Sequence, residues 1–279
     1  MAPRGCRSAD PRRPTRPHSV AALSSLLLWC PYPVHVLVQD GSVAAVVLAG
    51  GSGTRLEADG NKAFIPLAGR SVVSWSLNVF SELPTVGRRI LVIRPQDRDV
   101  ATKIIDRELK DPSVELIEGG ASRPGSEWAA LNYLRADIVA GMVGFVAIHD
   151  AARPFMTRSL AQAVFDAAAE SGGSMPGIVA EDLGSIDSDG HLQPVLAPGS
   201  GRLVRTQTPQ VFRAKELISA YKLAQADGFE GTDTATTVRR YSNVKIRLVE
   251  GDVWNLKITY PQDLFTAERI LSAMHYTLL

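Results

Sequence analysis

A glycine-rich segment and a nearby lysine are the residues of this sequence best suited to phosphate chemistry. The segment reads Ala49-Gly50-Gly51-Ser52-Gly53-Thr54-Arg55, and Lys62 follows it. Glycine lets a backbone approach a ligand closely, and successive N–H groups in such a loop form an anion-binding concavity. Arg55 adds a planar fork of donors that suits phosphate oxygens, so Arg55 and Lys62 could clamp a triphosphate. The segment fits neither the dinucleotide nor the P-loop fingerprint, and an ordinary glycine turn with a solvated arginine is the alternative.

An acidic residue and a second arginine follow an apolar stretch, in His149-Asp150-Ala151-Ala152-Arg153-Pro154-Phe155. A carboxylate at the end of a buried strand is well placed to hold Mg²⁺ shared with phosphates, so Asp150 is the candidate metal ligand. Arg153 could meet an anionic substrate. The alternative is that Asp150 pairs with Arg153 in a structural turn. A buried, hydrogen-bonded imidazole explains His149 at least as well as a catalytic one, and we assign it no acid–base role.

Two further segments could complete a nucleotide site. Gly119 and Gly120 again follow a predicted strand, and their backbone groups could read the edge of a base with help from the Ser126 hydroxyl. The alternative for Ser126 is a helix N-cap. Lys257 stands between apolar residues, where a buried cation is costly unless it meets an anion.

The remaining polar segments give weaker signals. Thr208 lies in Thr206–Gln210 and Thr232 lies in Thr232–Thr234, and their hydroxyls suit turns and helix caps as well as a ligand. The sequence shows no Ser-His-Asp set, no cysteine nucleophile and no histidine cluster with metal spacing. Charged side chains and backbone N–H groups therefore remain as the groups that could carry out the chemistry.

The elements that must position these residues alternate between strands and helices. Short apolar runs predict strands at residues 43–48, 90–93, 114–117, 144–148, 174–179 and 244–249. Amphipathic or capped segments predict helices at 71–79, 97–109, 126–134, 157–170, 215–224 and from about Pro261, with Ser71 and Thr157 as N-caps. This alternation predicts an α/β fold with a mostly parallel, doubly wound sheet, which binds ligands at the carboxyl ends of its strands.

Two regions depart from the alternation. Residues 181–206 are rich in glycine and proline, and we predict a β-arm that projects from the core. Residues 1–41 combine a basic stretch with an apolar run from Val20 to Cys30, which is shorter than the roughly 20 residues of a membrane-spanning helix. We interpret this segment as a disordered tail or a start assigned too far upstream, with a targeting segment as the alternative. Residues 42–279 are then a single domain.

Composition and charge narrow the function further. Hydrophobic residues make up 45% of the 279-residue chain, which is enough for a real core. The formal net charge of +1 gives no global field for nucleic acid or a membrane surface, so we expect neither as a partner. The two cysteines, Cys6 and Cys30, both fall in the first thirty residues, which argues against a disulfide framework or a cysteine-based metal site.

The motifs occur in the order found in a known family. The segments 49–55, 119–123, 149–155, 208–210 and 257–259, together with Lys62, resemble those of the 2-C-methyl-D-erythritol 4-phosphate cytidylyltransferases of the non-mevalonate isoprenoid pathway. They are also similar to those of the ribitol-5-phosphate cytidylyltransferases. The resemblance implies a nucleotide-diphospho-sugar-transferase-like, Rossmann-type fold and a cytoplasmic enzyme that transfers CMP from CTP to a polyol phosphate.

The resemblance also assigns roles to individual residues. It implies that Ala49, Gly50, Gly51, Ser52, Gly53 and Arg55 hold the CTP phosphates, that Lys62 stabilises the transition state, and that Lys257 contacts the α-phosphate. It implies that Gly120 and Ser126 read cytosine. Asp150, Arg153, Thr208 and Thr232 would bind the acceptor, with Asp150 also beside Mg²⁺ or another divalent cation. A homodimer is implied, in which the arm completes the acceptor site of the partner.

The sequence departs from the first family's pattern at several positions. Gly50 stands where alanine is usual, whereas the ribitol enzymes also have glycine at this position. Asn61 replaces the proline that usually precedes the lysine. In the arm, Leu183 follows Asp182 where a threonine is expected, and Ser200 occupies the place of an acceptor-gripping arginine, for which Arg202 or Arg205 could substitute. Methylerythritol phosphate is the expected acceptor. The alternatives are ribitol 5-phosphate, a sugar 1-phosphate with another nucleotide, and a nucleotide-binding protein without turnover.

Overall fold

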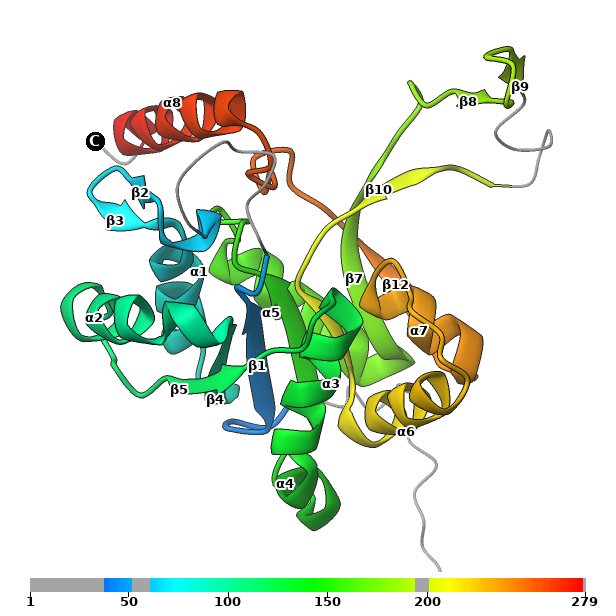
Figure 1. Cartoon of the computed structure of the whole chain (residues 1–279), viewed down its shortest axis with the longest axis horizontal. Helices are drawn as coiled ribbons and strands as arrows, with labels where there is room; N and C mark the ends of the chain where they lie inside the picture. Colours follow the sequence, from blue (N-terminus) through cyan, green and yellow to red (C-terminus); the bar gives the residue numbers. More distant parts are fainter. Residues whose placement is uncertain (1–37, 52–60, 194–200, 278–279) are drawn as a thin grey trace, which may run out of the picture. The chain divides into compact units, whose positions relative to one another are not determined.

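A single mixed sheet forms the centre of the part of the chain that the structure describes. The structure is a computed structural model, and it describes residues 38–51, 61–193 and 201–277. The sheet has the strand order β10-β7-β11-β6-β1-β4-β5, and β12 pairs with β7 (Figure 1). The strands are β1 (Val43–Leu48), β4 (Val86–Ile93), β5 (Glu115–Glu118), β6 (Phe145–Asp150), β7 (Gly172–Val179), β10 (Val204–Thr206), β11 (Gln210–Arg213) and β12 (Lys245–Glu250).

The predicted mostly parallel sheet is confirmed. Strand β1 pairs in parallel with both β4 and β6, β4 pairs in parallel with β5, and β12 pairs in parallel with β7. Only β10 and β11 run against the others among the described strands of this sheet. The carboxyl ends of β6, β1, β4 and β5 therefore lie along one edge, as a doubly wound sheet requires.

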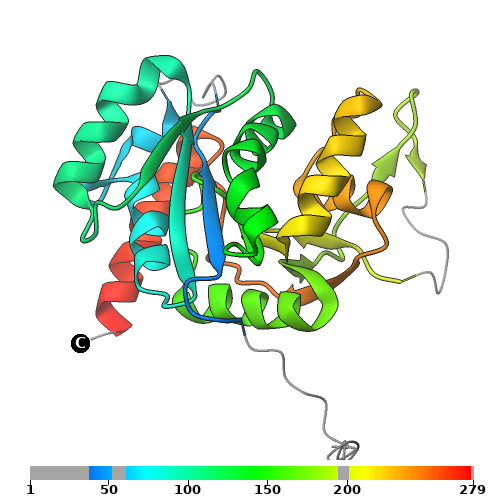
Figure 2. The same cartoon turned by 90° about the horizontal axis from the view of Figure 1, so that it is seen from below.

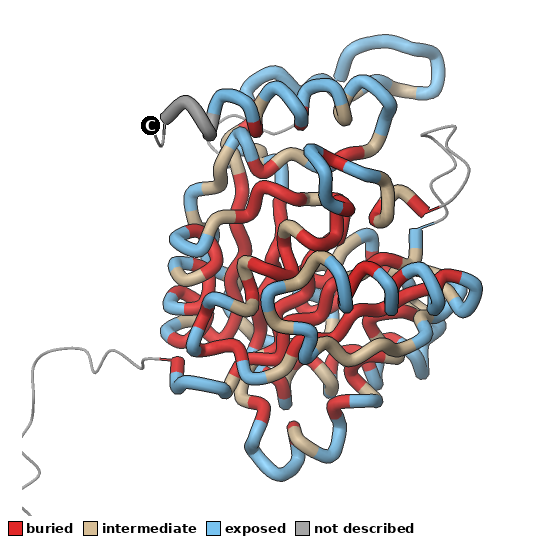
Figure 3. Tube along the Cα trace, turned by 90° about the vertical axis from the view of Figure 1, so that its left-hand side faces the viewer, coloured by how far each residue is buried: buried red, intermediate tan, exposed pale blue. Residues whose placement is uncertain are grey.

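Helices cover both faces of the sheet (Figure 2). Those that pack on one face are α1 (Val72–Ser81), α2 (Arg98–Glu108) and α5 (Arg158–Ser171). Those on the other are α3 (Arg123–Tyr133), α4 (Arg135–Ala140), α6 (Ala214–Ala226) and α7 (Thr234–Tyr241). Strand β1 shows why both faces are filled, because Val43, Ala45 and Val47 pack with the first group of helices, whereas Ala44 and Val46 pack with the second. Figure 3 shows the buried residues gathered in the interior, with the exposed residues around the outside.

A smaller apolar cluster supports the end of the chain. Helix α8 (Pro261–Thr277) packs with Leu67 of β2 (Pro66–Leu67) and with Val72, which follows β3 (Arg70–Ser71). Phe155 and Ile258 belong to the same buried cluster. This cluster fixes the extended segment that joins β12 to α8, and Lys257 lies on that segment.

The structure corrects several local predictions. Strand β11 and helix α7 were not predicted. Helix α3 begins at Arg123 instead of Ser126, because the Ser122 hydroxyl accepts a hydrogen bond from the Gly125 N–H at 3.2 Å. Ser71 does precede α1, but its side chain donates to Glu108 at 2.9 Å and does not cap the helix. The predicted cap by Thr157 is confirmed, since its hydroxyl accepts from the Leu160 N–H.

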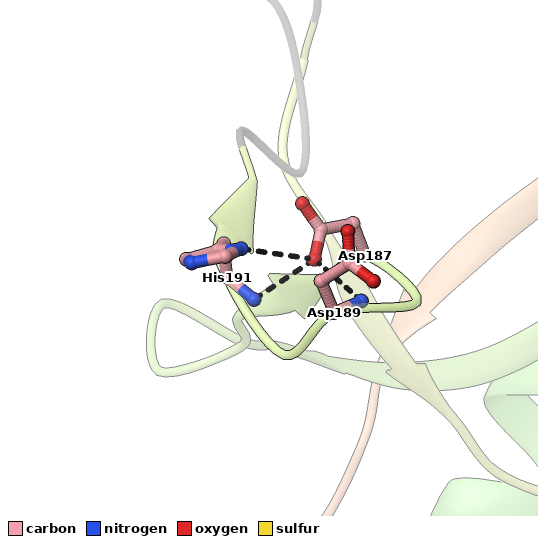
Figure 4. A group of neighbouring side chains, drawn as sticks. All are labelled: Asp187, Asp189 and His191. Atoms are coloured by element: carbon pink, nitrogen blue, oxygen red, sulfur yellow. Dashed lines mark hydrogen bonds and ion pairs between the residues drawn. The ribbon is translucent and has the colours of Figure 1, made fainter.

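The segment predicted as an arm leaves the sheet after β7 and returns through β10. Its outer part carries a hairpin of β8 (Ser185–Ile186) and β9 (Leu192–Gln193) that stands clear of the helices in Figure 1. Asp187, Asp189 and His191 lie together in the hairpin turn, with potential metal-ligand atoms within 4.8 Å of one another. The Asp187 carboxylate accepts from the N–H groups of Asp189 and His191 at 3.0 and 2.9 Å, as an ordinary turn requires (Figure 4).

The described chain is already packed just before β1. Val38 is buried in the first core cluster, and Gly41 donates its N–H to the carbonyl of Pro84 at 2.9 Å. Residues 1–37 lie outside the described residues. None of the described helices is both long enough and apolar enough to cross a membrane.

Candidate active site

A cavity of about 400 Å³ opens at the carboxyl ends of the parallel strands. Strands β1, β5 and β6 end beside it at Leu48, Glu118 and Asp150. The residues that line it come from four distant parts of the chain: Leu48, Gly50, Gly51, Lys62, Gly120, Ala121, Ser122, Arg123, Ser126, Asp150, Ala152 and Lys257. The topology thus brings together six predicted site residues besides the metal candidate itself: Gly50, Gly51, Lys62, Gly120, Ser126 and Lys257.

Asn61 positions Lys62 against the glycine loop. Its side chain is buried, donates to the carbonyl of Ala49 and to the Asp97 carboxylate at 2.8 Å, and accepts from the Ala63 N–H at 3.1 Å. It therefore caps the short 3₁₀ helix η2 (Lys62–Phe64) and ties it to the end of β1. A Cβ on Gly51 would lie only 3.8 Å from Lys62 Cε, which places the lysine stem beside the loop.

Gly120, of the second glycine pair, lines the cavity next to the start of α3. A Cβ on Gly120 would lie 2.7 Å from the Gly125 carbonyl carbon, so no larger residue fits without a shift of the backbone. Ser126 is inside α3, and its hydroxyl donates to the Gly120 carbonyl at 3.4 Å. The N-cap interpretation of Ser126 is therefore wrong, and Ser126 is among the residues that line the cavity.

Asp150 is the centre of a dense charge cluster. Its Oδ2 lies 2.9 Å from Lys257 Nζ and 3.7 Å from Arg153 Nε, and its Oδ1 lies 3.3 Å from Arg123 Nη2. Burial disfavours the charged carboxylate, but Lys257, Arg123 and Arg153 outweigh it and hold the pKa of Asp150 far below its ordinary range. Asp150 is thus an anion whose orientation is fixed from both oxygens.

Two hydrogen bonds hold the segment that carries Lys257 in place. The Ile258 N–H donates to the carbonyl of Ala152 at 2.8 Å, and the buried Asn255 side chain donates to the carbonyl of Thr208 at 3.1 Å. The segment that carries Lys257 is therefore attached on both sides to residues next to Asp150. Because the lysine side chain is 40% exposed, its ammonium group can still meet a ligand.

His149 and Thr208 form a buried support behind Asp150. The Asp150 N–H donates to the Thr208 hydroxyl at 3.1 Å, and that hydroxyl lies 3.0 Å from His149 Nδ1. The other ring nitrogen, Nε2, is 3.1 Å from the Arg153 carbonyl, which can only accept, so Nε2 carries the proton and Nδ1 accepts from Thr208. Burial lowers the pKa of His149 to about 4, so the imidazole is neutral at pH 7. The hypothesis of a buried, hydrogen-bonded histidine is confirmed.

Arg153 lies behind Asp150 and is not among the residues that line the cavity. Its guanidinium donates to the carbonyls of Asn255 and Thr206 at 2.7 and 3.3 Å. Burial lowers the pKa of Arg153, and Asp150 counteracts that shift. The alternative from the sequence, an ion pair between Asp150 and Arg153, is present, although its 3.7 Å distance makes it looser than the pair with Lys257.

The other predicted residues fall in three places. Ser52, Gly53 and Arg55 lie outside the described residues. Ala49 is buried at the end of β1 and does not line the cavity. Thr232 is exposed, and its loop reaches the cavity rim through Glu230, which accepts from the Ser122 hydroxyl at 2.8 Å.

Comparison with known proteins shows to which family this chain belongs. A profile of the family described as IspD, 2-C-methyl-D-erythritol 4-phosphate cytidylyltransferase, matches residues 43–273. The chain belongs to the IspD family. It is therefore a nucleotidyltransferase of the cytidylyl type.

Individual relatives agree with the assignment to the IspD family. A 2-C-methyl-D-erythritol 4-phosphate cytidylyltransferase of Solibacter usitatus is 34% identical over 82% of this chain and 95% of its own length. That of Symbiobacterium thermophilum is 36% identical over 82% of this chain and 92% of its own length. Among solved structures, the 4-diphosphocytidyl-2C-methyl-D-erythritol synthase of Anaerococcus prevotii has a TM-score of 0.71 at 26% identity, over 83% of this chain and 97% of that one.

Sequence reasoning missed two side chains that shape this IspD-family site. Arg123 lines the cavity and joins Asp150 to the buried Glu127. The sequence contains a signal for the start of this helix, because a serine N-cap followed by proline in the first turn, as in Ser122-Arg123-Pro124, is typical of a helix start. That signal places Arg123 at the first position of α3. Asn61 was noted only as a departure from the family pattern, yet an asparagine before a short helical turn is a typical cap.

The cavity suits a divalent cation shared with phosphates. Mg²⁺ takes oxygen ligands and usually uses one or two carboxylates together with substrate phosphates and water. Asp150 supplies one ionised carboxylate at the cavity wall, and Lys62 and Lys257 place two cationic side chains in the same cavity. Asp150 is the residue that would hold the cation.

Proposed function

We propose that this protein transfers CMP from CTP to 2-C-methyl-D-erythritol 4-phosphate and releases pyrophosphate. The observation that carries the proposal is the single cavity that contains Lys62, Lys257 and Asp150 between two glycine-rich loops. The relatives described above are named for the same reaction, which favours methylerythritol phosphate over ribitol 5-phosphate as the acceptor.

The reaction needs positioning and charge more than proton transfer. A phosphate oxygen of the acceptor attacks the α-phosphorus of CTP in line, a new P–O bond forms, and the bond to the β-phosphate oxygen breaks. No general base is required, because the acceptor phosphate is already an anion at pH 7. Lys62 and Lys257 stabilise the charge that builds on the phosphate oxygens in the transition state, and Arg55 would add to them from the glycine loop.

Two walls of the cavity divide the recognition of CTP. We propose that Gly50 and Gly51, together with Ser52 and Gly53, bind the phosphates through their N–H groups, and that Gly120 and Ser126 bind the cytosine. A divalent cation, when bound at Asp150, neutralises part of the triphosphate charge. Asp150 itself stays ionised because three cations surround it.

Asp150 also marks the side from which the acceptor enters. Arg153 and Thr208 contact Asp150 on the side away from the cavity. We propose that they affect acceptor binding mainly by fixing the position of the Asp150 carboxylate. Thr232 lies on a loop at the rim, where it could meet the acceptor directly. The proposal includes a homodimer in which the arm, residues 181–206, completes the acceptor site of the partner.

Turnover with defined substrates tests the proposal. Purified protein is incubated with CTP, Mg²⁺ and either methylerythritol 4-phosphate or ribitol 5-phosphate, and pyrophosphate release is followed together with the nucleotide product. We expect product with the first acceptor and at least about a tenfold lower kcat/KM with the second, which corresponds to about 1.4 kcal/mol. Competition by UTP and GTP tests the base. Absence of pyrophosphate release with every acceptor, despite CTP binding, would favour a protein without turnover.

A further inference from the structure

A fully buried glutamate lies one layer behind the cavity and has no part in the reaction described above. Glu127 is on α3 and is 0% exposed. Its Oε1 accepts from the Thr234 hydroxyl of α7 at 2.8 Å, and its Oε2 accepts from the Tyr221 hydroxyl of α6. Thr234 and Tyr221 are also buried. One carboxylate thus connects three helices on the same face of the sheet.

Glu127 also connects this helical layer to the cavity. Arg123, one turn earlier on α3, donates Nη1 to Glu127 Oε1 and reaches Asp150 Oδ1 with Nη2 at 3.3 Å. Arg123 lines the cavity, so a single guanidinium joins a buried carboxylate to the one at the cavity wall. Because the guanidinium is planar, fixing one edge on Glu127 fixes the direction of the other edge.

The charge balance around Asp150 explains why a second carboxylate is useful. Three cations, Arg123, Arg153 and Lys257, converge on the single carboxylate of Asp150. Like charges that share one counterion repel, and Arg123 would move away from the other two unless it had a partner of its own. Glu127 is that partner, and it holds the guanidinium on the side away from Lys257.

A role in packing alone does not account for this arrangement. Burying a carboxylate is costly, and replacing a whole buried ion pair by apolar residues of similar size is often neutral or stabilising. Burial raises the pKa of Glu127, and the Arg123 guanidinium opposes that shift. The Glu127 carboxylate has no access to solvent and accepts from two hydroxyls and one guanidinium. These contacts indicate that the role of Glu127 is to orient the Arg123 guanidinium.

We propose that Glu127 is a positioning residue that fixes Arg123, so that this guanidinium orients Asp150 and meets the triphosphate from a set direction. This inference rests on the proposed cytidylyltransferase activity. It assigns Glu127 an effect on turnover that is exerted only through Arg123.

A double-mutant cycle on the full-length protein tests the inference. The variants are Glu127→Gln, Arg123→Met and the double variant, with kcat and the KM for CTP measured for each. Glu127→Gln keeps the size and an acceptor oxygen but removes the charge. We expect it to lower kcat by about 10- to 100-fold, as a displacement of about 1 Å at a reacting group can, and to change the KM for CTP less than about threefold. Because the effect passes through Arg123, the double variant should be no slower than Arg123→Met.

A matched trio elsewhere in the fold provides the control. Glu115 at the start of β5 binds Arg88 and accepts from the Tyr133 hydroxyl at 2.7 Å, so it repeats the same chemistry away from the cavity. Glu115→Gln should leave kcat unchanged. Tyr221→Phe serves if Glu127→Gln does not fold, and it should lower kcat by a smaller factor without raising the KM for CTP.

The outcomes separate this inference from the proposed function. No turnover by the unmodified protein would refute the function itself. Normal turnover by the unmodified protein with an unchanged kcat in Glu127→Gln, or in Tyr221→Phe where that variant is used, would overturn the positioning role. Independent, multiplicative losses in the double variant would also overturn it, because a structural role does not depend on Arg123.

Discussion

Replacing Lys257 by methionine separates the catalytic value of this cation from its structural value. In the free protein its ammonium lies 2.9 Å from Asp150 Oδ2, but the side chain is 40% exposed. Exposed ion pairs contribute about 0–1 kcal/mol. The Asp150 carboxylate is only 11% exposed, but it keeps Arg123 and Arg153 as partners, so the loss of Lys257 does not leave a buried charge unpaired. Lys257→Met preserves the aliphatic stem, so we expect the free energy of unfolding to fall by about 1 kcal/mol or less.

The loss should be much larger during catalysis. A cation about 4 Å from a unit phosphate charge is stabilised by about 4 kcal/mol at an effective dielectric constant of about 20. Loss of one preorganised donor commonly costs about 2.7–4 kcal/mol of barrier, which is about 10²–10³ in kcat. We therefore expect Lys257→Met to lower kcat by two to three orders of magnitude.

Steady-state pyrophosphate release at saturating CTP and acceptor gives kcat, and urea unfolding gives the stability of the same samples. Lys110→Met is the matched control, because Lys110 forms a comparable pair with Glu82 at 2.7 Å on the protein surface. It should leave kcat unchanged. A kcat for Lys257→Met within about fivefold of that of the unmodified protein would refute the reasoning. A fivefold decrease corresponds to only about 1 kcal/mol of activation free energy, whereas the expected loss is about 4 kcal/mol.

Three further outcomes follow from the geometry. Lys62→Ala should lower kcat by about 10²–10³ and raise the KM for CTP far less, because its charge acts on the transition state; unchanged turnover would remove it from the site. Gly120→Ala should raise the KM for CTP about tenfold or more, since the new Cβ would lie 2.7 Å from the backbone of Gly125, whereas Gly144→Ala, with no contact closer than 3.8 Å, should not. The unfolding free energy should fall as the pH drops from about 6.5 towards 4, by up to about 3 kcal/mol, because His149 has a folded pKa of about 4 and an unfolded pKa near 6.5. That stability is complete above pH 6.5, and urea titrations of His149→Asn should show a shallower decline; equal slopes would contradict the assignment.

The sequence was informative where burial alone determines structure. The apolar runs that predicted β1, β6 and β7 are buried on both faces of the sheet, so hydrophobicity marked them directly. Strand β11 escaped because Gln210 and Arg213 flank only two apolar residues. Helix α7 escaped because its threonines have low helix propensity, and tertiary packing of Ala235 and Val238 overrides that preference.

Within the site, polar residues at predicted strand ends could be found, but their contacts could not. Asp150 was recognisable because it ends an apolar strand. Glu127 was not, since a glutamate in an amphipathic helix ordinarily faces solvent and nothing local reveals its partners on α6 and α7. Ser122 and Ser126 were likewise confused as helix starts, because both precede residues that can open a helix.

The central claim is that the cations at 62 and 257 surround one triphosphate next to Asp150. A crystal structure of the protein with CTP and Mg²⁺ measures this directly. We expect the phosphates to lie between Lys62 and Lys257, the cytosine to contact Gly120 and Ser126, and the cation to have an Asp150 oxygen as ligand. A triphosphate bound at another surface, with either lysine beyond salt-bridge distance of every phosphate oxygen, would contradict the account.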